Sequence, residues 1–209
     1  MSLKRAIDCV RKNKNFLITS HVNLEGDALG SELAFYRLLK KMGKCATIIN
    51  QDKHSARYDF LPGVNNIKKF KNSLKGLKFD CFAFLDCAEL KRCGQISKIN
   101  LSGKAVLNID HHISNTGFGD INWIDMDASS CAEIIYKLYK ELDIALDKAT
   151  AILLYTGMLT DTGSFRYSNT SSFTHQAIAE LLKYNINVPE IYRSVYEDIP
   201  FQELKLLTK

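Results

Sequence analysis

The chain has 209 residues, of which 28 are basic and 23 acidic, so its net charge at neutral pH is +5. A hydrophobic share of 46% with only three prolines excludes intrinsic disorder, and the length is sufficient for a buried core. The basic excess is compatible with an anionic substrate, but many domains without a nucleic-acid partner carry as much. The six cysteines form no CxxC pair and the N-terminus lacks a signal-peptide core. We therefore expect a cytoplasmic protein without disulfides, structural zinc or a membrane span.

Short apolar runs alternate with longer segments of helical period through the first two thirds of the chain. Strands are predicted at residues 16–20, 46–50, 81–86, 105–109 and, from a weaker pattern, 121–124. Apolar positions at helical spacing predict helices over residues 28–42 and 131–142. Strands that are apolar on both faces and separated by helices indicate an α/β fold. We expect a mainly parallel β-sheet flanked by helices on both faces.

The last third of the chain is mostly helical in pattern. Helices are predicted over residues 149–160, 172–184, 188–196 and 200–207. The polar stretch 161–166 interrupts them and is predicted to be a turn. Pro200 suits the first turn of the last helix, because proline lacks the N–H that is unsatisfied there in any case.

His21, Glu25 and Asp27 lie in the loop between the first predicted strand and the first predicted helix. Gly26 and Gly30 permit a tight turn and close packing there, so the three polar side chains are able to converge above the strand end. Asp27 is equally well explained as a helix cap, and this alternative stays open on sequence grounds. A dinucleotide-binding glycine loop fits less well, because three ligand-type side chains would crowd a pyrophosphate.

Asp86 and the sequence Asp110-His111-His112 follow two further predicted strands. In parallel sheets, functional residues gather beyond the carboxyl ends of the strands. A lone aspartate there is often only a turn former, but two histidines after an acid are hard to explain as core residues. Neighbouring side chains on an extended chain point in opposite directions, so we expect one histidine to face a metal and the other a substrate. Asp110 is expected to hold a ring N–H from behind.

Asp161 begins a polar turn that ends at Arg166; the alternative is a simple helix end with a solvated arginine. The candidate ligands are mostly carboxylates with a few imidazoles and no thiolate, which favours Mn²⁺ or Mg²⁺ over zinc. Acids from several strand ends allow one carboxylate to bridge two ions about 3.5–4 Å apart, as in two-metal phosphoryl hydrolysis. His112 and Arg166 are then natural partners for the phosphate.

Four motifs occur along the chain in a fixed order. They are His-x-Asn-x-acid-Gly-Asp-Ala-x-Gly-Ser from His21, a lone Asp86, Asp-His-His from Asp110, and Thr-Asp-Thr-Gly-x-Phe-Arg ending at Arg166. Together, over residues 16–166, they resemble the DHH phosphoesterases. Within that family the resemblance is to the RecJ/NrnA-like branch of bifunctional oligoribonucleases and pAp phosphatases. Four ordered motifs are far more specific than any one of them.

The resemblance implies a role for each site residue. One Mn²⁺ would take three ligands: His21, Glu25 and Asp86. The second Mn²⁺ would take four ligands: Asp27, Asp86, His111 and Asp161. Mg²⁺ is the alternative metal. The residues expected to orient the cluster or contact the phosphate are Asp110, His112 and Arg166. Further residues match stretches that support the site in this family: Asn115, Ser129, Ser130 and Glu133.

Two features depart from the family pattern. Residues 24–25 read Leu-Glu where the family usually reads Pro-Asp, so Glu25 is expected to bind its metal with altered affinity. The family also carries a C-terminal substrate-binding domain with a glycine-rich, histidine-containing motif that this sequence does not match. We therefore expect a catalytic domain over residues 1–185 and a helical linker over residues 186–209 toward an absent domain, as in a truncated chain; the alternative is a stand-alone catalytic domain. Activity on oligonucleotides is then expected to be weak.

The resemblance predicts an enzyme that uses two manganese ions to hydrolyse phosphoesters. Its substrates would be short oligonucleotides (nanoRNA), cleaved to mononucleotides, or 3′-phosphoadenosine 5′-phosphate, cleaved to AMP. The alternatives are a linear or cyclic dinucleotide phosphodiesterase, a manganese inorganic pyrophosphatase and a degenerate, non-catalytic nucleotide-binding module. Expected partners are short single-stranded RNA or DNA or a nucleotide, and no membrane; a homodimer stays open.

Overall fold

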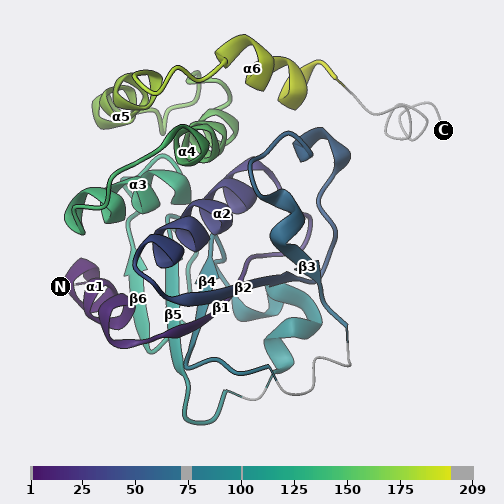
Figure 1. The fold of residues 1–209 in the computed structure, drawn as a ribbon, viewed down its shortest axis with the longest axis vertical. Helices are drawn as coiled ribbons and strands as arrows, with labels where there is room; N and C mark the ends of the chain where they lie inside the picture. Colours follow the sequence, from purple (N-terminus) through teal and green to yellow (C-terminus); the bar gives the residue numbers. More distant parts are fainter. Residues whose placement is uncertain (1, 72–76, 100, 199–209) are drawn as a thin grey trace.

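The computed structural model describes residues 2–71, 77–99 and 101–198. Its sheet has six strands in the order β3-β2-β1-β4-β5-β6, and every neighbouring pair is parallel (Figure 1). The strands are β1 (Asn15–Thr19), β2 (Cys45–Asn50), β3 (Ile67–Lys69), β4 (Cys81–Leu85), β5 (Ala105–Asp110) and β6 (Ile121–Ile124). The predicted parallel α/β fold is confirmed. The predicted strands coincide with all of these except the short edge strand β3.

Most of the α-helices begin at a polar cap. The α-helices are α1 (Ser2–Lys12), α2 (Gly26–Lys41), α3 (Cys131–Glu141), α4 (Lys148–Asp161), α5 (Ser172–Leu182) and α6 (Val188–Tyr196). The 3₁₀ segments are η1 (Ala56–Tyr58), η2 (Val64–Asn66) and η3 (Leu90–Lys98). Side-chain oxygens of Ser130, Asp147 and Ser171 accept hydrogen bonds from the first turns of α3, α4 and α5. The helix predicted over residues 200–207 lies outside the described residues.

The two faces of the sheet are covered in different ways. Alternate residues of each strand point to opposite faces, so Phe16 and Ile18 of β1 enter one core while Leu17 enters the other. The first core receives side chains from all six α-helices of the described residues, and Figure 1 shows α2, α3 and α4 along this face with α5 and α6 farther out. The second core is closed by η3, through Cys93 and Ile96. Helices were expected on both faces, but on the second face the cover is a 3₁₀ segment and its flanking loops.

Close packing between α2 and α4 sets the position of the site. A Cβ atom on Gly30 would collide with the backbone oxygen of Leu153, and one on Gly26 would meet the side chain of Thr160 at 2.6 Å. The two glycines therefore let α4 approach the first turns of α2 directly. As a result, Asp27 on α2 lies beside the C-terminal turn of α4.

The end of the described chain packs onto the same core. Ile191 and Val195 of α6 are buried against it, although this helix lies beyond the predicted domain boundary at residue 185. That boundary stays a prediction. No helix among the described residues is long and apolar enough to cross a membrane.

Candidate metal centre

The polar cluster lies at the carboxyl ends of three adjacent strands, β1, β4 and β5. His21 follows β1, Asp86 follows β4, and His111 follows β5. The Ser20 hydroxyl donates a hydrogen bond of 2.7 Å to the backbone oxygen of Leu85, which holds the first two strand ends together. The sequence-predicted candidates therefore meet at one edge of the sheet, as expected for a parallel α/β fold.

Asp86 is the centre of the cluster. Its Oδ2 atom lies 3.4 Å from Nε2 of His21, and its Oδ1 atom lies 3.6 Å from both Nε2 of His111 and Nδ1 of His112. The residue is 2% exposed and its backbone has a left-handed φ of 52°. A non-glycine residue in this region costs about 1–2 kcal/mol, and such strain concentrates at functional sites.

Asp27 caps a helix, but not the one it belongs to. Its two carboxylate oxygens accept hydrogen bonds from the backbone N–H groups of Cys131 (2.7 Å) and Ala132 (2.8 Å), in the first turn of α3. Ser31 donates a third bond of 3.2 Å from its hydroxyl. The positive end of α3 thereby fixes a carboxylate 4.0 Å from Nε2 of His111. Capping and metal binding, which the sequence left as alternatives, are compatible for this residue.

Asp161 and Glu25 both approach histidines of the cluster, but Asp161 is the more buried of the two. Asp161 is the last residue of α4, where a turn was expected, and its Oδ2 lies 3.3 Å from Nε2 of His111. Glu25 occupies the N-cap position of α2 without a side-chain capping bond. Its Oε1 lies 3.7 Å from Nε2 of His21, and its side chain is 62% exposed. Glu25 is thus near the cluster, but its side chain is weakly fixed.

Asp110 is fully buried and orients His112. Its Oδ1 accepts hydrogen bonds from Nδ1 of His112 (2.7 Å) and the backbone N–H of His111 (2.9 Å). Its Oδ2 accepts a bond of 2.5 Å from the amide of Asn115. The expectation that the two histidines point in opposite directions is wrong: their ring centroids are 4.6 Å apart and both rings approach Asp86. Strand β5 ends at Asp110, so the alternation of an extended chain does not continue through them.

The proton affinities of the cluster reflect crowded negative charge. Burial, followed by the charges of Asp86 and Asp161, raises the pKa of Asp27 well above its usual range. Burial and the charge of Asp86 also raise the pKa of Asp161 to about 7. The pKa values of two imidazoles are raised as well, because the neighbouring carboxylates favour the protonated rings. Burial of His21 opposes its protonation, but the hydrogen bond and charge of Asp86 outweigh it and raise the pKa to about 9. The hydrogen bond to Asp110 likewise raises the pKa of His112 to about 9. A cation placed here would relieve the repulsion among the carboxylates.

Two buried atoms in the cluster have no hydrogen-bond partner: Asp86 Oδ1 and His111 Nε2. Buried polar atoms are nearly always paired, so unpaired ones indicate a missing partner. Two overlapping sets of side chains each offer donor atoms within 4.8 Å of one another: Asp86, Asp110, His111 and His112, and Asp27, His111 and Asp161. Carboxylate oxygens and imidazole nitrogens are common ligands of divalent metal ions. The residues present therefore fit a divalent metal centre.

The remaining predicted residues lie around the cluster. Ser130 caps α3, and Glu133 accepts 2.7 Å hydrogen bonds from the hydroxyls of Ser129 and Thr174. These contacts hold the helix terminus that binds Asp27, so these three predicted residues support the site indirectly. Arg166 is exposed, and its Nε donates a 2.8 Å bond to the backbone oxygen of Gly163.

The sequence did not reveal the backbone donors of Cys131 and Ala132. Peptide N–H groups leave no signature in side-chain identity. The Ser130 cap and Glu133, three residues later, marked a helix start that was available to bind an anion.

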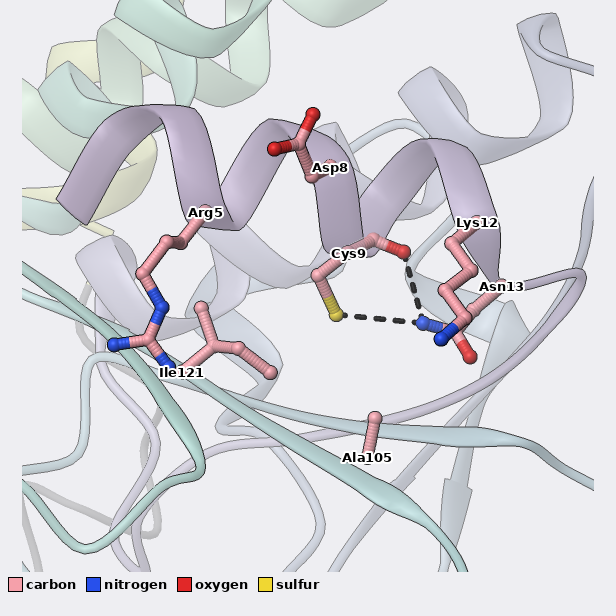
Figure 2. A pocket seen from close by; sticks show the side chains of 7 residues that line it. All are labelled: Arg5, Asp8, Cys9, Lys12, Asn13, Ala105 and Ile121. Atoms are coloured by element: carbon pink, nitrogen blue, oxygen red, sulfur yellow. Dashed lines mark hydrogen bonds between the residues drawn. The ribbon is translucent and has the colours of Figure 1, made fainter. Parts of the chain in front are cut away.

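A separate cavity of 290 Å³ lies between α1 and the sheet, lined by Arg5, Cys9 and Lys12 on the helix and by Ala105 and Ile121 below (Figure 2). Ala105 is the first residue of β5 and Asp110 is the last. Five residue steps along a strand correspond to about 17 Å. The cavity therefore lies at the amino ends of the strands, away from the metal-type cluster, by which we mean the candidate ligands around Asp86, and it is not part of that cluster.

Comparisons with known proteins agree with this geometry. Residues 15–158 match the model of the DHH family, N-terminal domain. The chain is 33% identical over 175 residues, 83% of its length, to the bifunctional oligoribonuclease and PAP phosphatase NrnA of Thermus thermophilus, and covers 51% of that protein. It is 38% identical over 99 residues, 46% of its length, to the NrnA of Bacillus subtilis, and covers 32% of it.

A solved structure is similar over nearly the whole chain. An exopolyphosphatase-related protein from Bacteroides fragilis superposes with a TM-score of 0.88 at 28% identity, over 99% of this chain and 63% of that one. The chain thus spans between about a third and two thirds of the length of these relatives. Members of the family whose model it matches are metal-dependent phosphoesterases. The chain belongs to the DHH family.

Proposed function

We propose that this chain is the catalytic part of a two-manganese phosphoesterase that acts on short oligonucleotides and on 3′-phosphoadenosine 5′-phosphate. The observation that carries the proposal is the pair of unpaired buried atoms, Asp86 Oδ1 and His111 Nε2, 3.6 Å apart at the meeting point of three strand ends. Both are atoms that bind divalent metals. A purely structural polar cluster would pair such atoms with each other or with the backbone.

The two predicted ligand sets share Asp86. One set is completed by His21 and Glu25, the other by Asp27, His111 and Asp161. A pair of cations held by these residues would supply Lewis-acid activation of water and would neutralise charge on the phosphate oxygens. Mg²⁺ would satisfy the carboxylates, but the imidazoles favour Mn²⁺.

His112 and Arg166 are the proposed phosphate partners. Asp110 occupies Nδ1 of His112, so Nε2 is the nitrogen left to donate a hydrogen bond to a phosphate or leaving-group oxygen. Asn115 holds the other carboxylate oxygen of Asp110 and thereby the orientation of the pair. The stem of Arg166 is anchored through Nε to Gly163, which leaves its two terminal nitrogens for a phosphate.

The choice of substrate rests on the relatives. The two NrnA proteins are named as oligoribonucleases and PAP phosphatases, and the chain covers 51% and 32% of their lengths. Both reactions cleave a phosphoester of a nucleotide, so a single phosphate site serves both. Cyclic dinucleotide hydrolysis and pyrophosphate hydrolysis use the same chemistry and form additional arms of the test.

The experiment compares the wild type with Asp86→Ala and with Asp59→Ala. The second variant is a control, because it removes an exposed carboxylate. Mn²⁺ binding is measured by calorimetry. Hydrolysis is then followed with pApA, 3′-phosphoadenosine 5′-phosphate, a cyclic dinucleotide and pyrophosphate. We expect Mn²⁺-dependent release of AMP from the first two substrates by wild type and control, and loss of both binding and turnover in Asp86→Ala. Unchanged Mn²⁺ binding in Asp86→Ala would contradict the site, and hydrolysis of pyrophosphate alone would contradict the substrate class.

A further inference from the structure

Tyr167 is an exposed aromatic residue in the turn between α4 and α5. Its side chain is 58% exposed. A Cβ atom built on Gly163 would lie against its ring, 2.5 Å from Cε1 and 2.6 Å from Cε2, with Cζ as its nearest neighbour. Nearly equal distances to the two Cε atoms, together with the closer Cζ, place that point over a face of the ring rather than at its rim. One face of Tyr167 therefore packs on the glycine, and the exposed area belongs largely to the other face.

The turn that carries this ring is held in one conformation. Gly163, Ser164 and Phe165 have successive left-handed φ values of 54°, 61° and 65°, which reverse the chain direction. The backbone N–H of Tyr167 then returns to the backbone oxygen of Thr162 at 3.0 Å. Two non-glycine residues in this region are strained, and local strain of this kind is typical of functional turns. An aromatic ring that is already fixed loses little conformational entropy when it binds a ligand.

The same turn is tied directly to the metal-type cluster. The amide of Asn169 donates to the backbone oxygens of Asp161 (3.1 Å) and Ser129 (2.9 Å). Gly163 is two residues beyond Asp161, so their Cα atoms are at most about 7.6 Å apart. The ring rests on the Cα of Gly163, so it lies within roughly 12 Å of the Cα of Asp161. That separation is short enough for one nucleotide to span.

We propose that Tyr167 is a nucleobase-binding surface, on which the base of a nucleotide stacks while its phosphate lies at the cluster. Arg166, the preceding residue, provides the positive charge that an adjoining phosphate requires. An exposed aromatic face beside an arginine is the arrangement used for single-stranded nucleic acids, and it accepts every base because each has a π-face. The inference rests on the proposed function, and it assigns the base contact to this chain itself.

The test compares AMP with ribose 5-phosphate, which has the same phosphate and no base. Binding of each is measured by calorimetry in the presence of Mn²⁺, for wild type, Tyr167→Phe, Tyr167→Ala and Tyr192→Ala. The last variant is a control, because Tyr192 is an exposed tyrosine (41%) on α6. We expect the wild type to bind AMP roughly 5- to 150-fold more tightly than ribose 5-phosphate, the range of one base stacked on an aromatic ring. Tyr167→Phe and Tyr192→Ala retain that preference. Tyr167→Ala loses it, with its affinity for ribose 5-phosphate unchanged.

The outcomes separate this inference from the proposed function. Equal affinity of the wild type for the two compounds, or an unchanged preference in Tyr167→Ala, overturns the role of Tyr167 and leaves the phosphate site intact. Binding of ribose 5-phosphate that survives in Asp86→Ala overturns the phosphate site instead. A wild type that binds neither compound contradicts both. Melting temperatures of all variants are compared first, so that a loss of binding is not a loss of fold.

Discussion

The two halves of the metal-type cluster are built in different ways. Asp27 is 1% exposed and is fixed by two peptide N–H groups of α3 and by a serine hydroxyl. Glu25 lies only two residues earlier, yet its side chain is 62% exposed and its Oε1 atom approaches Nε2 of His21 no closer than 3.7 Å. One carboxylate is therefore held before any ligand arrives, and the other must be ordered on binding.

This difference predicts two unequal cation sites. Ordering a long side chain on binding costs up to about 2 kcal/mol of conformational entropy. A carboxylate that is already ordered in the free protein does not have this cost when it binds a metal. We therefore expect the ion bound by Asp27, His111 and Asp161 to be the tighter one. The ion bound by His21 and Glu25 would then be the weaker and more exchangeable.

The largest effect is expected from a change in the preorganised half. Asp27→Asn removes a charge and turns an amide NH₂ toward one of the two helix N–H groups, which loses its acceptor in a buried position. We expect a loss of the tighter Mn²⁺ and of roughly 10³-fold in turnover, with a stability loss of about 1–3 kcal/mol even without metal. Calorimetry and urea unfolding in EDTA measure the two effects. A variant of wild-type stability would show that α3 does not depend on this carboxylate.

A smaller effect is expected from the exposed half. Glu25→Ala should weaken only the second Mn²⁺, by roughly 10- to 100-fold. It should leave stability in EDTA unchanged, because the side chain is 62% exposed. Glu25→Asp, which restores the residue usual in the family, should retain both ions with a changed affinity for the weaker one. The number of Mn²⁺ ions bound and their affinities are measured by calorimetry for the wild type and both variants. A wild type that binds one ion while Glu25→Asp binds two would contradict the assignment of Glu25.

The sequence was sufficient to predict the fold where periodicity is strong. The apolar runs of β1, β4 and β5 and the second half of β2 are buried on both faces, and that pattern alone indicates a parallel sheet. Strand β3 was missed because it has three residues, Ile-Lys-Lys, of which the lysines are exposed at the sheet edge. Segment η3 was missed because a 3₁₀ stretch with a left-handed Gly94 at its middle has no helical period of 3.6 residues.

The sequence predicted which residues gather at the site but not how they are held. Positions after strand ends are readable from local pattern, and that is why His21, Asp86 and His111 were found. The contacts of Asp27 join residues more than a hundred positions apart, and no local pattern specifies them. The ring orientation of His112 depends on where β5 ends, and element boundaries are the least certain part of any sequence-based prediction.

A moderate effect is expected from the residue that positions Asp110. Asn115→Ala removes the hydrogen bond to Oδ2 of Asp110. The carboxylate that orients His112 is then held less firmly. We expect kcat to fall by roughly 10-fold with KM nearly unchanged, because the ligands of both ions remain. Thr116→Ala, in the same loop, is the matched control, since the Thr116 hydroxyl donates to the backbone oxygen of Ala88 and not to Asp110. An equal loss in both variants would indicate a general loosening of the loop.

The smallest effect on activity, but a distinct one on stability, is expected behind the exposed half. Glu32 is fully buried and accepts a 2.7 Å hydrogen bond from the amide of Asn50, which in turn accepts one from the backbone N–H of Ser20. Burial raises the pKa of Glu32 from 4.5 to about 8. Its other oxygen has no hydrogen-bond partner within the described residues, so Glu32→Gln should fit the same space.

The sign of the pH effect follows from that raised pKa. Between about pH 4.5 and pH 8 the folded chain retains a proton on Glu32 that the unfolded chain has released, so this residue makes stability fall as pH rises. The slope reaches at most about 1.4 kcal/mol per pH unit. Glutamine has no proton to lose, so in EDTA Glu32→Gln should gain stability over the wild type steadily from pH 5 to pH 8. Parallel unfolding curves across that range would show that Glu32 is already ionised in the fold. A buried negative charge would then lie within electrostatic range of His21, and it would favour a cation in the exposed half of the centre.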